Sequence, residues 1–304
     1  MAIAVHEVIL FPVFGETECL GYVTVANSKG SLFNRMKAEI ESRNPLAARL
    51  YRMIRDEVRY QRLAPAITPE GFKFVGDETM QTGNFEPEEM SIIKRCLEDA
   101  DVLVDIGANT GLYTCLARSM SKHAIAVEPH PENLRLLYRN LEENGWEDVE
   151  VWPIGLSESS RVLTLYGGNT GASVVKGWAD IPETWKQRIA VHTLDQILDH
   201  RFADKRIVVK VDVEGAEYSV LQGALNTLKR LPKPAWLMEI TLTLHHPEVN
   251  RQFLKTFDIF WQNGYEARTG DCVQQLVTRS DVERWAQHGV CDFGTHNWLF
   301  VSGI

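Results

Sequence analysis

A short glycine-containing turn, preceded by an acid, is the part of the sequence best suited to bind a small molecule. The apolar run Val102–Ile106 contains Asp105 and leads into Gly107-Ala-Asn-Thr-Gly111, after which an apolar helical pattern begins. Glycine has no Cβ, so Gly107 and Gly111 would let the backbone come close to a ligand. A strand, a glycine turn and a helix in this order are typical of a site that binds a nucleotide cofactor at the carboxyl end of a strand.

The residues around this turn distinguish two classes of cofactor. A dinucleotide-binding turn has glycines at positions one, three and six, but Asn109 and Leu112 stand at the third and sixth positions here. Asp105 would also place a negative charge near a pyrophosphate. S-adenosylmethionine has no phosphate and tolerates that acid, and Glu128, at the end of the next strand, can accept hydrogen bonds from both ribose hydroxyls. We therefore favour S-adenosylmethionine, with Asp105 supporting the loop or meeting the ammonium group and with Asn109 supplying an amide.

Candidates for the chemical step follow two later apolar runs. Asp212 comes directly after the fourth run, Glu239 lies at the end of the fifth, and His245 follows on a loop before a proline. A hydroxyl is a poor nucleophile at neutral pH, so methyl transfer to it calls for a general base or a metal that acidifies it. We expect Asp212, Glu239 and His245 to converge on the acceptor hydroxyl. Two activating devices stay open: His245 as the base, or a Mg²⁺ or Mn²⁺ ion held by the three side chains.

Other polar residues near these candidates have simpler interpretations. Glu214 and Glu217 open the helix after Asp212, and we expect Glu217 to complement the helix N-terminus. For His245 itself, plain exposure on a loop is an alternative of equal weight. The histidines outside the His245-His246 pair lack comparable context and are expected to be structural or surface residues: His6, His123, His130, His192, His200, His288 and His296.

The elements that would position these residues alternate between strand and helix. The apolar runs are those of buried strands, and helical patterns separate most of them. One such helix follows Pro131 and should stop at Gly145, and another should run from Val220 to Leu228 after the fourth run. Strands that alternate with helices predict an α/β fold with a doubly wound parallel sheet. The five runs lie at Val102–Ile106, Ala124–Val127, Val149–Ile154, Ile207–Val211 and Ala235–Ile240.

Two regions depart from this alternation. Residues 1 to 80 combine a hairpin pattern with two helical patterns interrupted by Pro45, and we expect them to form an α+β cap or an oligomerisation region before a cofactor-binding domain over residues 81–304. Between Gly155 and Thr193 a strand-like stretch, a glycine-rich stretch and two tryptophans predict an insertion above the sheet. Its aromatic residues Trp178 and Trp185 would either cover a substrate or pack on the insertion itself.

Several spaced motifs resemble the FkbM family of methyltransferases, over roughly residues 83 to 265. The first 80 residues do not visibly share the resemblance. The matching segments are Gly83-Asn-Phe-Glu-Pro87, Val104-Asp-Ile-Gly-Ala-Asn-Thr-Gly111, Val127-Glu-Pro-His-Pro-Glu-Asn133, Asn140, Thr193-Leu-Asp-Gln196, Lys210-Val-Asp-Val-Glu-Gly-Ala-Glu217 and Val220-Leu-Gln-Gly-Ala224.

This resemblance implies a class I methyltransferase fold, which is Rossmann-like, with seven strands of which the last is antiparallel. It also implies O-methylation of a hydroxyl on a sugar, a glycan or a secondary metabolite. Carried over by position, Glu128 would bind the ribose of S-adenosylmethionine and Gly155 would lie near the adenine. The residues that would hold the methionine half are Asp105, Gly107, Asn109 and Gly111. The last two strands would begin near Gly264 and Asn297.

Composition fits a compact enzyme. The 304 residues are 44% hydrophobic and 24% charged, with a formal charge of −9 that disfavours nucleic acid as a partner. The five cysteines are scattered and odd in number, so we expect neither a zinc site nor a disulfide framework, and a cytoplasmic location is the default. The first ten residues lack a basic segment and are not expected to be a signal peptide. No apolar run approaches the ~18 residues of a membrane helix, so we expect no transmembrane segment.

Three functions of different classes remain open. The favoured one is an S-adenosylmethionine-dependent O-methyltransferase with a small-molecule or glycan acceptor, and a homo-oligomeric state is left open. An NAD-dependent oxidoreductase is the alternative enzyme, and the glycine spacing counts against it. A non-catalytic accessory protein that keeps the fold is the other alternative, and the intact acids at 105, 128, 212 and 239 count against such decay.

Overall fold

The structure is a computed structural model, and it describes residues 44–168, 171–181, 183–246 and 248–303. The chain divides into two compact units, Met1–Arg62 and Leu63–Ile304. The described element of the first unit is helix α2 (Pro45–Arg62), which confirms the second of the two helices predicted around Pro45. The hairpin and the helix predicted before Pro45 lie outside the described residues. That residues 1 to 80 act as a cap or an oligomerisation region stays a prediction.

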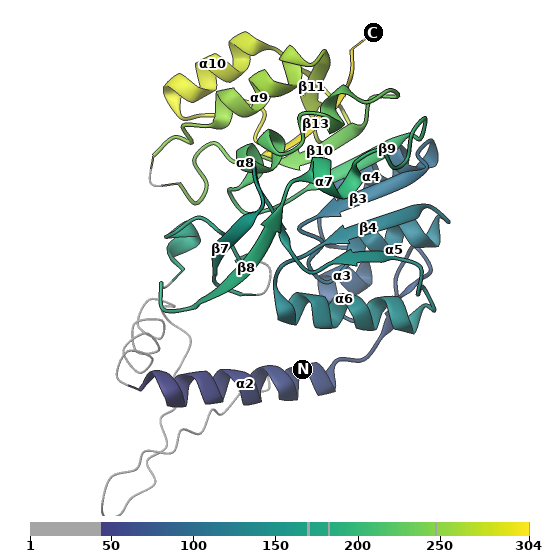
Figure 1. Cartoon of the computed structure of the whole chain (residues 1–304), viewed down its shortest axis with the longest axis vertical. Coiled ribbons are helices and arrows are strands. Elements are labelled where there is room, and N and C mark those ends of the chain that lie inside the picture. Colours follow the sequence, from purple (N-terminus) through teal and green to yellow (C-terminus); the bar gives the residue numbers. More distant parts are fainter. Residues whose placement is uncertain (1–43, 169–170, 182, 247, 304) are drawn as a thin grey trace, which may run out of the picture. The chain divides into compact units, whose positions relative to one another are not determined.

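An eight-stranded sheet forms the centre of the second unit, in the order β12-β11-β13-β10-β9-β3-β4-β5 (Figure 1). Strands β10, β9, β3, β4 and β5 are parallel, and β13 is antiparallel to both of its neighbours. Without the two-residue edge strand β12, this is the seven-stranded class I methyltransferase sheet that we expected. The strands are β3 (Val102–Ile106), β4 (His123–Val127), β5 (Glu150–Trp152), β9 (Ile207–Val211), β10 (Ala235–Glu239), β11 (Tyr265–Thr269), β12 (Leu276–Val277) and β13 (Asn297–Ser302).

Helices pack on both faces of the sheet because successive strand residues point to opposite faces. On one face, Leu103 and Val208 join a core with α4 (Pro87–Glu98), α5 (Leu112–Ser119) and α6 (Pro131–Glu143). On the other face, Val104 and Val209 join a core with four later helices. Both faces of the central strands are therefore buried, which explains their continuous apolar runs. The helices of the second face are α7 (Leu194–Leu198), α8 (Glu217–Gln222), α9 (Phe253–Gln262) and α10 (Arg279–His288).

Helix boundaries follow the predicted signals, with one exception. Pro131 is the first residue of α6, and Gly145 adopts a left-handed φ of 67° just after that helix ends. The longer helix expected from Val220 to Leu228 is instead the short α8 followed by the 3₁₀ turn η3 (Thr227–Lys229). Helix α8 ends at Gly223, where a Cβ would lie 2.2 Å from the carbonyl oxygen of Ser157, so the chain there packs closely against a neighbouring segment.

The predicted insertion forms a separate three-stranded sheet, in the order β6-β8-β7. Its strands are β6 (Gly155–Leu156), β7 (Arg161–Tyr166) and β8 (Lys186–His192), with the 3₁₀ turn η2 (Trp178–Asp180) between β7 and β8. We call residues 161–192 the flap. In Figure 1 the strands β7 and β8 lie beyond one end of the parallel strands.

The second unit begins with a segment that precedes α4. Its elements are β1 (Ala66–Ile67), β2 (Lys73–Phe74) and α3 (Glu78–Thr82). Strands β1 and β2 pair as an antiparallel hairpin, and β2 contacts α6. Among the described helices of either unit, none is long and apolar enough to cross a membrane.

Candidate functional site

The glycine turn lies at the carboxyl end of β3, against the residue that follows β9. Gly107 and Gly111 have φ values of 79° and 87°, a left-handed conformation that other residues rarely adopt. A Cβ on Gly107 would lie 1.8 Å from the backbone oxygen of Asp212, so only glycine lets the turn pass the end of β9. Gly111 is the N-cap residue of α5. The backbone therefore requires both predicted glycines, and Gly107 brings the turn against Asp212.

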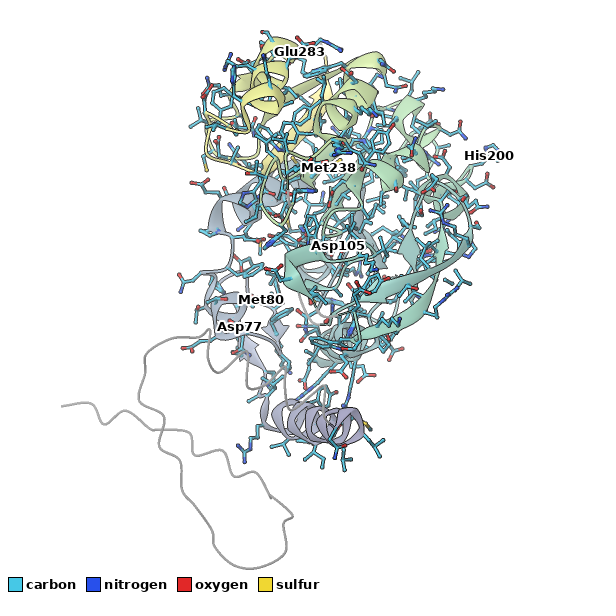
Figure 2. The ribbon with its side chains drawn as sticks, turned by 90° about the vertical axis from the view of Figure 1, so that its left-hand side faces the viewer. Asp77, Met80, Asp105, His200, Met238 and Glu283 are labelled. Carbon is cyan, nitrogen blue, oxygen red and sulfur yellow. The ribbon has the colours of Figure 1, made fainter. Side chains whose placement is uncertain are left out.

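Asp105 lies in the interior of the domain, where Figure 2 labels it. Its side chain is 0% exposed, and its Oδ2 accepts a hydrogen bond from the Thr114 hydroxyl at 2.7 Å. Burial raises the pKa of Asp105, although nearby Lys210 opposes that shift. The other oxygen, Oδ1, and the side-chain oxygen of Asn109 are also buried, and neither has a hydrogen-bond partner among the described residues. Buried acceptors of this kind nearly always have a donor, so these two oxygens are suited to a ligand.

Glu128, just after β4, fixes the conformation of the glycine turn. Its Oε2 accepts the backbone N–H of Asn109 at 2.9 Å, and its Oε1 accepts the backbone N–H of His130 at 2.7 Å. The Asn133 amide donates to Oε1 at 3.3 Å. Burial raises the pKa of Glu128 to about 7, although these hydrogen bonds lower it. Glu128 thus ties the turn to the start of α6 while its buried carboxyl group faces a cavity.

That cavity lies between the strand ends and the flap. The turn contributes Gly107 and Asn109, and the chain after β5 contributes Gly155. A Cβ on Gly155 would lie 3.1 Å from Ile189, so glycine keeps this part of the cavity open. The flap adds an apolar wall made of Leu165, Ala172, Val174 and Ile189.

The charges around the cavity have one sign. Glu128, Asp212 and Glu214 line it, and the buried Asp105 lies at the end of β3 next to the turn. No lysine, arginine or histidine is found among the described residues that line the cavity. A ligand that carries positive charge and no phosphate suits such a cavity, because an anionic group there would lack a counter-charge.

Asp212 belongs to a buried ion-pair network. Lys210, the fourth residue of β9, is 3% exposed, and its Nζ lies 3.2 Å from Asp212 Oδ2 and 3.3 Å from Glu89 Oε1. The ammonium also lies 4.6 Å from the centre of the Tyr113 ring. Burial disfavours the charge on Lys210, but Asp212 and Glu89 outweigh this effect and raise its pKa well above the ordinary value. The ion pair with Lys210 therefore holds Asp212 beside the glycine turn.

Glu239, the last residue of β10, is close enough to Asp212 for that carboxylate to raise its pKa. Burial and the negative charges of Asp212 and Glu214 raise the pKa of Glu239 to about 9. Its Oε1 lies 3.8 Å from Nε2 of His296, which immediately precedes β13. Asp212 and Glu239 therefore share one edge of the sheet, as parallel strand ends predict, and Glu239 is protonated at neutral pH.

His245 is held by a different part of the molecule. It is exposed and has a left-handed φ of 63°, and its ring centre lies 5.4 Å from that of Trp178 in the flap. Trp178 in turn donates a hydrogen bond to the Glu214 carboxylate. That His245 meets Asp212 and Glu239 at an acceptor hydroxyl stays a prediction. Within the described parts of the chain, no group of three or more His, Cys, Asp or Glu side chains is arranged to hold a metal ion, so the metal alternative gains no support.

Sequence reasoning missed several residues of this edge. Lys210 interrupts an otherwise apolar strand, and a lysine in a buried strand implies acidic partners, so it carried a usable signal. Glu89 resembles an ordinary acid in the first turn of a helix, but it is 5% exposed and faces Lys210. His296 stands beside the predicted last strand, whose register with β10 places Asn297 opposite Glu239. The contacts of Trp178 had no local signal.

Comparison with known proteins identifies the region that forms this site. The model of the FkbM methyltransferase domain matches residues 105–267. A hexuronic acid methyltransferase, AglP, from Haloferax volcanii is 31% identical over 144 residues, which are 46% of this chain and 58% of that protein. Methyltransferase 1 from Beauveria bassiana is 28% identical over 148 residues, covering 41% of this chain and 59% of that protein. The matches thus span less than two thirds of either relative.

Solved structures with a similar arrangement are more distant. An O-methyltransferase from Bacillus cereus in complex with SAH has a TM-score of 0.38 and 10% identity, covering 70% of this chain and 78% of that one. A precorrin-6y C5,15-methyltransferase from Geobacter metallireducens has a TM-score of 0.34 and 13% identity, covering 69% of this chain and 83% of that one.

Proposed function

Because the chain belongs to the FkbM methyltransferase domain family, we propose that it transfers a methyl group from S-adenosylmethionine to a hydroxyl group of a sugar, a glycan or a secondary metabolite. The observation that carries this proposal is the charge of the cavity. Its lining contains three carboxylates and, among the described residues, no basic side chain. A sulfonium cofactor with an ammonium group complements these carboxylates, whereas the pyrophosphate of a dinucleotide does not.

The chain's own residues suit each part of the cofactor. Asp105 Oδ1 and the Asn109 side-chain oxygen are the buried acceptors available to the methionine ammonium group. Glu128 has capacity for the ribose hydroxyls in addition to the N–H groups that it already accepts, since each carboxylate oxygen has two lone pairs. Gly155 leaves room for the adenine. Gly111 would act indirectly, by starting α5 in the orientation that shapes the turn.

Methyl transfer forms an O–CH₃ bond as the S–CH₃ bond breaks, and the hydroxyl proton must pass to a base. We assign this role to Asp212, because it lines the cavity and its carboxylate is paired with Lys210. Glu239, protonated below about pH 9, would donate a hydrogen bond that orients the acceptor. His245 is the alternative base.

The acceptor class rests on two considerations. The similarity to a hexuronic acid methyltransferase from Haloferax volcanii supports a sugar as acceptor. In this chain, the carboxylates of Asp212 and Glu214, which line the cavity, would repel an acceptor with its own negative charge. We therefore propose a neutral, hydroxyl-bearing acceptor in preference to a hexuronic acid.

A transfer assay with isotopically labelled methyl donor tests this proposal. The acceptors are methyl glycosides of neutral hexoses and matched hexuronic acids, and mass spectrometry locates the label. We expect an O-methyl product from a neutral hexoside, and turnover lowered about 10²–10⁴-fold in Asp212→Asn if it is the base. Glu239→Gln tests Glu239 as the hydrogen-bond donor to the acceptor, and His245→Ala tests His245 as the alternative base. Near-native rates in all three variants would place the chemistry elsewhere, and transfer to hexuronic acids alone would contradict the proposed acceptor.

A further inference from the structure

Trp178 is a buried aromatic residue in an exposed part of the flap. Its side chain is 3% exposed, whereas its described neighbours from Val175 to Gly177 and from Ala179 to Asp180 are exposed. The flap's own apolar cluster consists of Leu165, Ile189 and Val191 with their neighbours, and Trp178 is not part of it. The partners that bury Trp178 therefore come from outside the flap.

Those partners are two segments that follow β9 and β10, on the side of the cavity that we call the acceptor edge. The indole Nε1 of Trp178 donates a hydrogen bond to Glu214 Oε2 at 2.7 Å. The ring centres of His245 and His246 lie 5.4 Å and 5.0 Å from the indole, and the His246 ring meets it edge-on at 88°. Since Glu214 lines the cavity, a single flap side chain contacts both a cavity residue and the histidine loop.

The backbone is shaped to receive this indole. A Cβ on Gly215, which has a φ of 94°, would lie 2.5 Å from the Trp178 ring, so only glycine permits the contact. Next to it, the hydroxyl of Ser173 donates a hydrogen bond to the backbone oxygen of Glu214 at 2.5 Å. Two flap side chains, those of Trp178 and Ser173, thus bond to Glu214, one at its carboxylate and the other at its backbone oxygen.

The residues around the indole also have unusual backbone conformations. Ala179 and Asp180, directly after Trp178, have φ values of 49° and 56°. Glu214 and His245 have φ values of 54° and 63°. Non-glycine residues adopt this left-handed conformation at a cost and keep it where the surrounding contacts impose it, commonly at functional sites. Strained backbone on all three contacting segments indicates a specific arrangement rather than loose packing.

We propose that Trp178 is a positioning residue of the acceptor site, holding the Glu214 carboxylate and the His245–His246 loop beside the end of β9. This inference rests on the proposed methyl transfer. It assigns Trp178, unlike the flap residues that line the cavity, to recognition of the acceptor rather than of the methyl donor, because its contacts lie on the β9 and β10 side of the cavity. The residues suited to the donor lie mainly on the β3 and β4 side.

A double-mutant cycle of Trp178→Phe and Glu214→Ala tests the inference. Phenylalanine keeps an aromatic ring but removes the N–H, so the hydrogen bond to Glu214 is lost. The acceptor is the methyl hexoside that takes up most label in the transfer assay. We expect Trp178→Phe to raise the acceptor KM by about tenfold or more, the range expected when a hydrogen bond to a carboxylate is lost. The double variant should be little worse than either single variant, since both remove one interaction.

Donor binding separates positioning from a structural role. Calorimetry with SAH should give affinities within about twofold of the wild-type value for Trp178→Phe, because the donor contacts are elsewhere. Trp185→Phe is the matched control, because it makes the same change in the same flap. The Trp185 ring lies beside Gly168 instead of Glu214. We expect it to leave the acceptor KM unchanged.

Three results would overturn the inference. They are an unchanged acceptor KM in Trp178→Phe, additive effects in the double variant, and an equal loss of donor and acceptor affinity. A wild-type protein that binds SAH but labels no acceptor would instead refute the proposed function, and the role of Trp178 would fall with it.

Discussion

The two edges of the cavity are built in different ways. The edge that we assign to the cofactor comes from one strand–helix–strand unit, in which Glu128 accepts the N–H groups of Asn109 and His130. The edge that we assign to the acceptor combines segments far apart in the sequence, including Trp178, Glu214 and Glu239. Local hydrogen bonds hold the first edge, and contacts between distant segments hold the second. The sequence therefore indicates the cofactor edge more readily than the acceptor edge.

The edges also differ in how their acids are compensated. At the cofactor edge, N–H groups partly offset the effect of burial on the pKa of Glu128. At the acceptor edge, the buried cation Lys210 faces Asp212 and Glu89, and burial together with the charge of Asp212 raises the pKa of Glu214 and of Glu239. The arrangement at the cofactor edge suits a fixed binding site. The arrangement at the acceptor edge favours ligands without negative charge and provides carboxyl groups that can exchange protons.

Gly107→Ala should have the largest effect, because Gly107 is where the two edges touch. The added Cβ would overlap the backbone oxygen of Asp212 at 1.8 Å, so we expect a loss of about 4 kcal/mol or more in the free energy of unfolding, or failure to fold. Gly145→Ala is the control: its φ of 67° is similarly left-handed, but no atom lies within 4 Å of the added Cβ. That variant should lose only about 1–2 kcal/mol. Equal losses in denaturant unfolding would show that the contact with Asp212 is unimportant.

A smaller, pH-dependent effect is expected at Glu217, which begins α8 beside the acceptor edge. Burial raises its pKa from 4.5 to about 7, although the N–H of Gly215 donates to it at 2.8 Å. A carboxyl whose folded pKa is raised favours the folded state most below its unfolded pKa, and this contribution is lost as the pH rises through about 7. Glutamine cannot ionise and keeps an oxygen for Gly215.

Glu217→Gln should therefore be more stable than the wild type at pH 8, by up to about 3 kcal/mol, and closer to it at pH 5. Denaturant unfolding at the two pH values measures this difference. Some pH dependence should persist in the variant because Glu128 has a similarly raised pKa. The control Glu88→Gln changes an exposed acid in the first turn of α4 and should show no such gain. A Glu217→Gln variant that is less stable at pH 8 would show that the carboxylate itself is needed.

The difference between the edges explains what the sequence could predict. The apolar runs and the glycine turn are local signals, and they located β3, β4, β9 and β10 with the residues at their ends. Asp105, Gly107 and Glu128 could be proposed as site residues because strand, turn and acid follow one another in the chain. The predicted helix over 220–228 was too long, because Gly223 packs against Ser157, and sequence periodicity does not report such a contact.

The acceptor edge depends on which distant segments meet. Lys210 in a buried strand implies an acidic partner, but nothing near Glu89 in the sequence identifies it as that partner. Trp178 was recognised as a residue that either covers a substrate or packs on the flap, and nothing near it in the sequence identifies Glu214 as its partner. His296 was expected to be structural or at the surface, yet the pairing of β13 with β10 places it 3.8 Å from Glu239.

Calorimetric titration of the wild-type protein with S-adenosylmethionine, and separately with NADH, tests the central claim most directly. The carboxylate-lined cavity predicts one S-adenosylmethionine bound per chain and no NADH, and Glu128→Ala should weaken the binding by removing the acceptor that fixes the glycine turn. Binding of NADH without binding of S-adenosylmethionine would contradict the account, because the cavity would then accommodate two phosphates with no basic residue among its described lining.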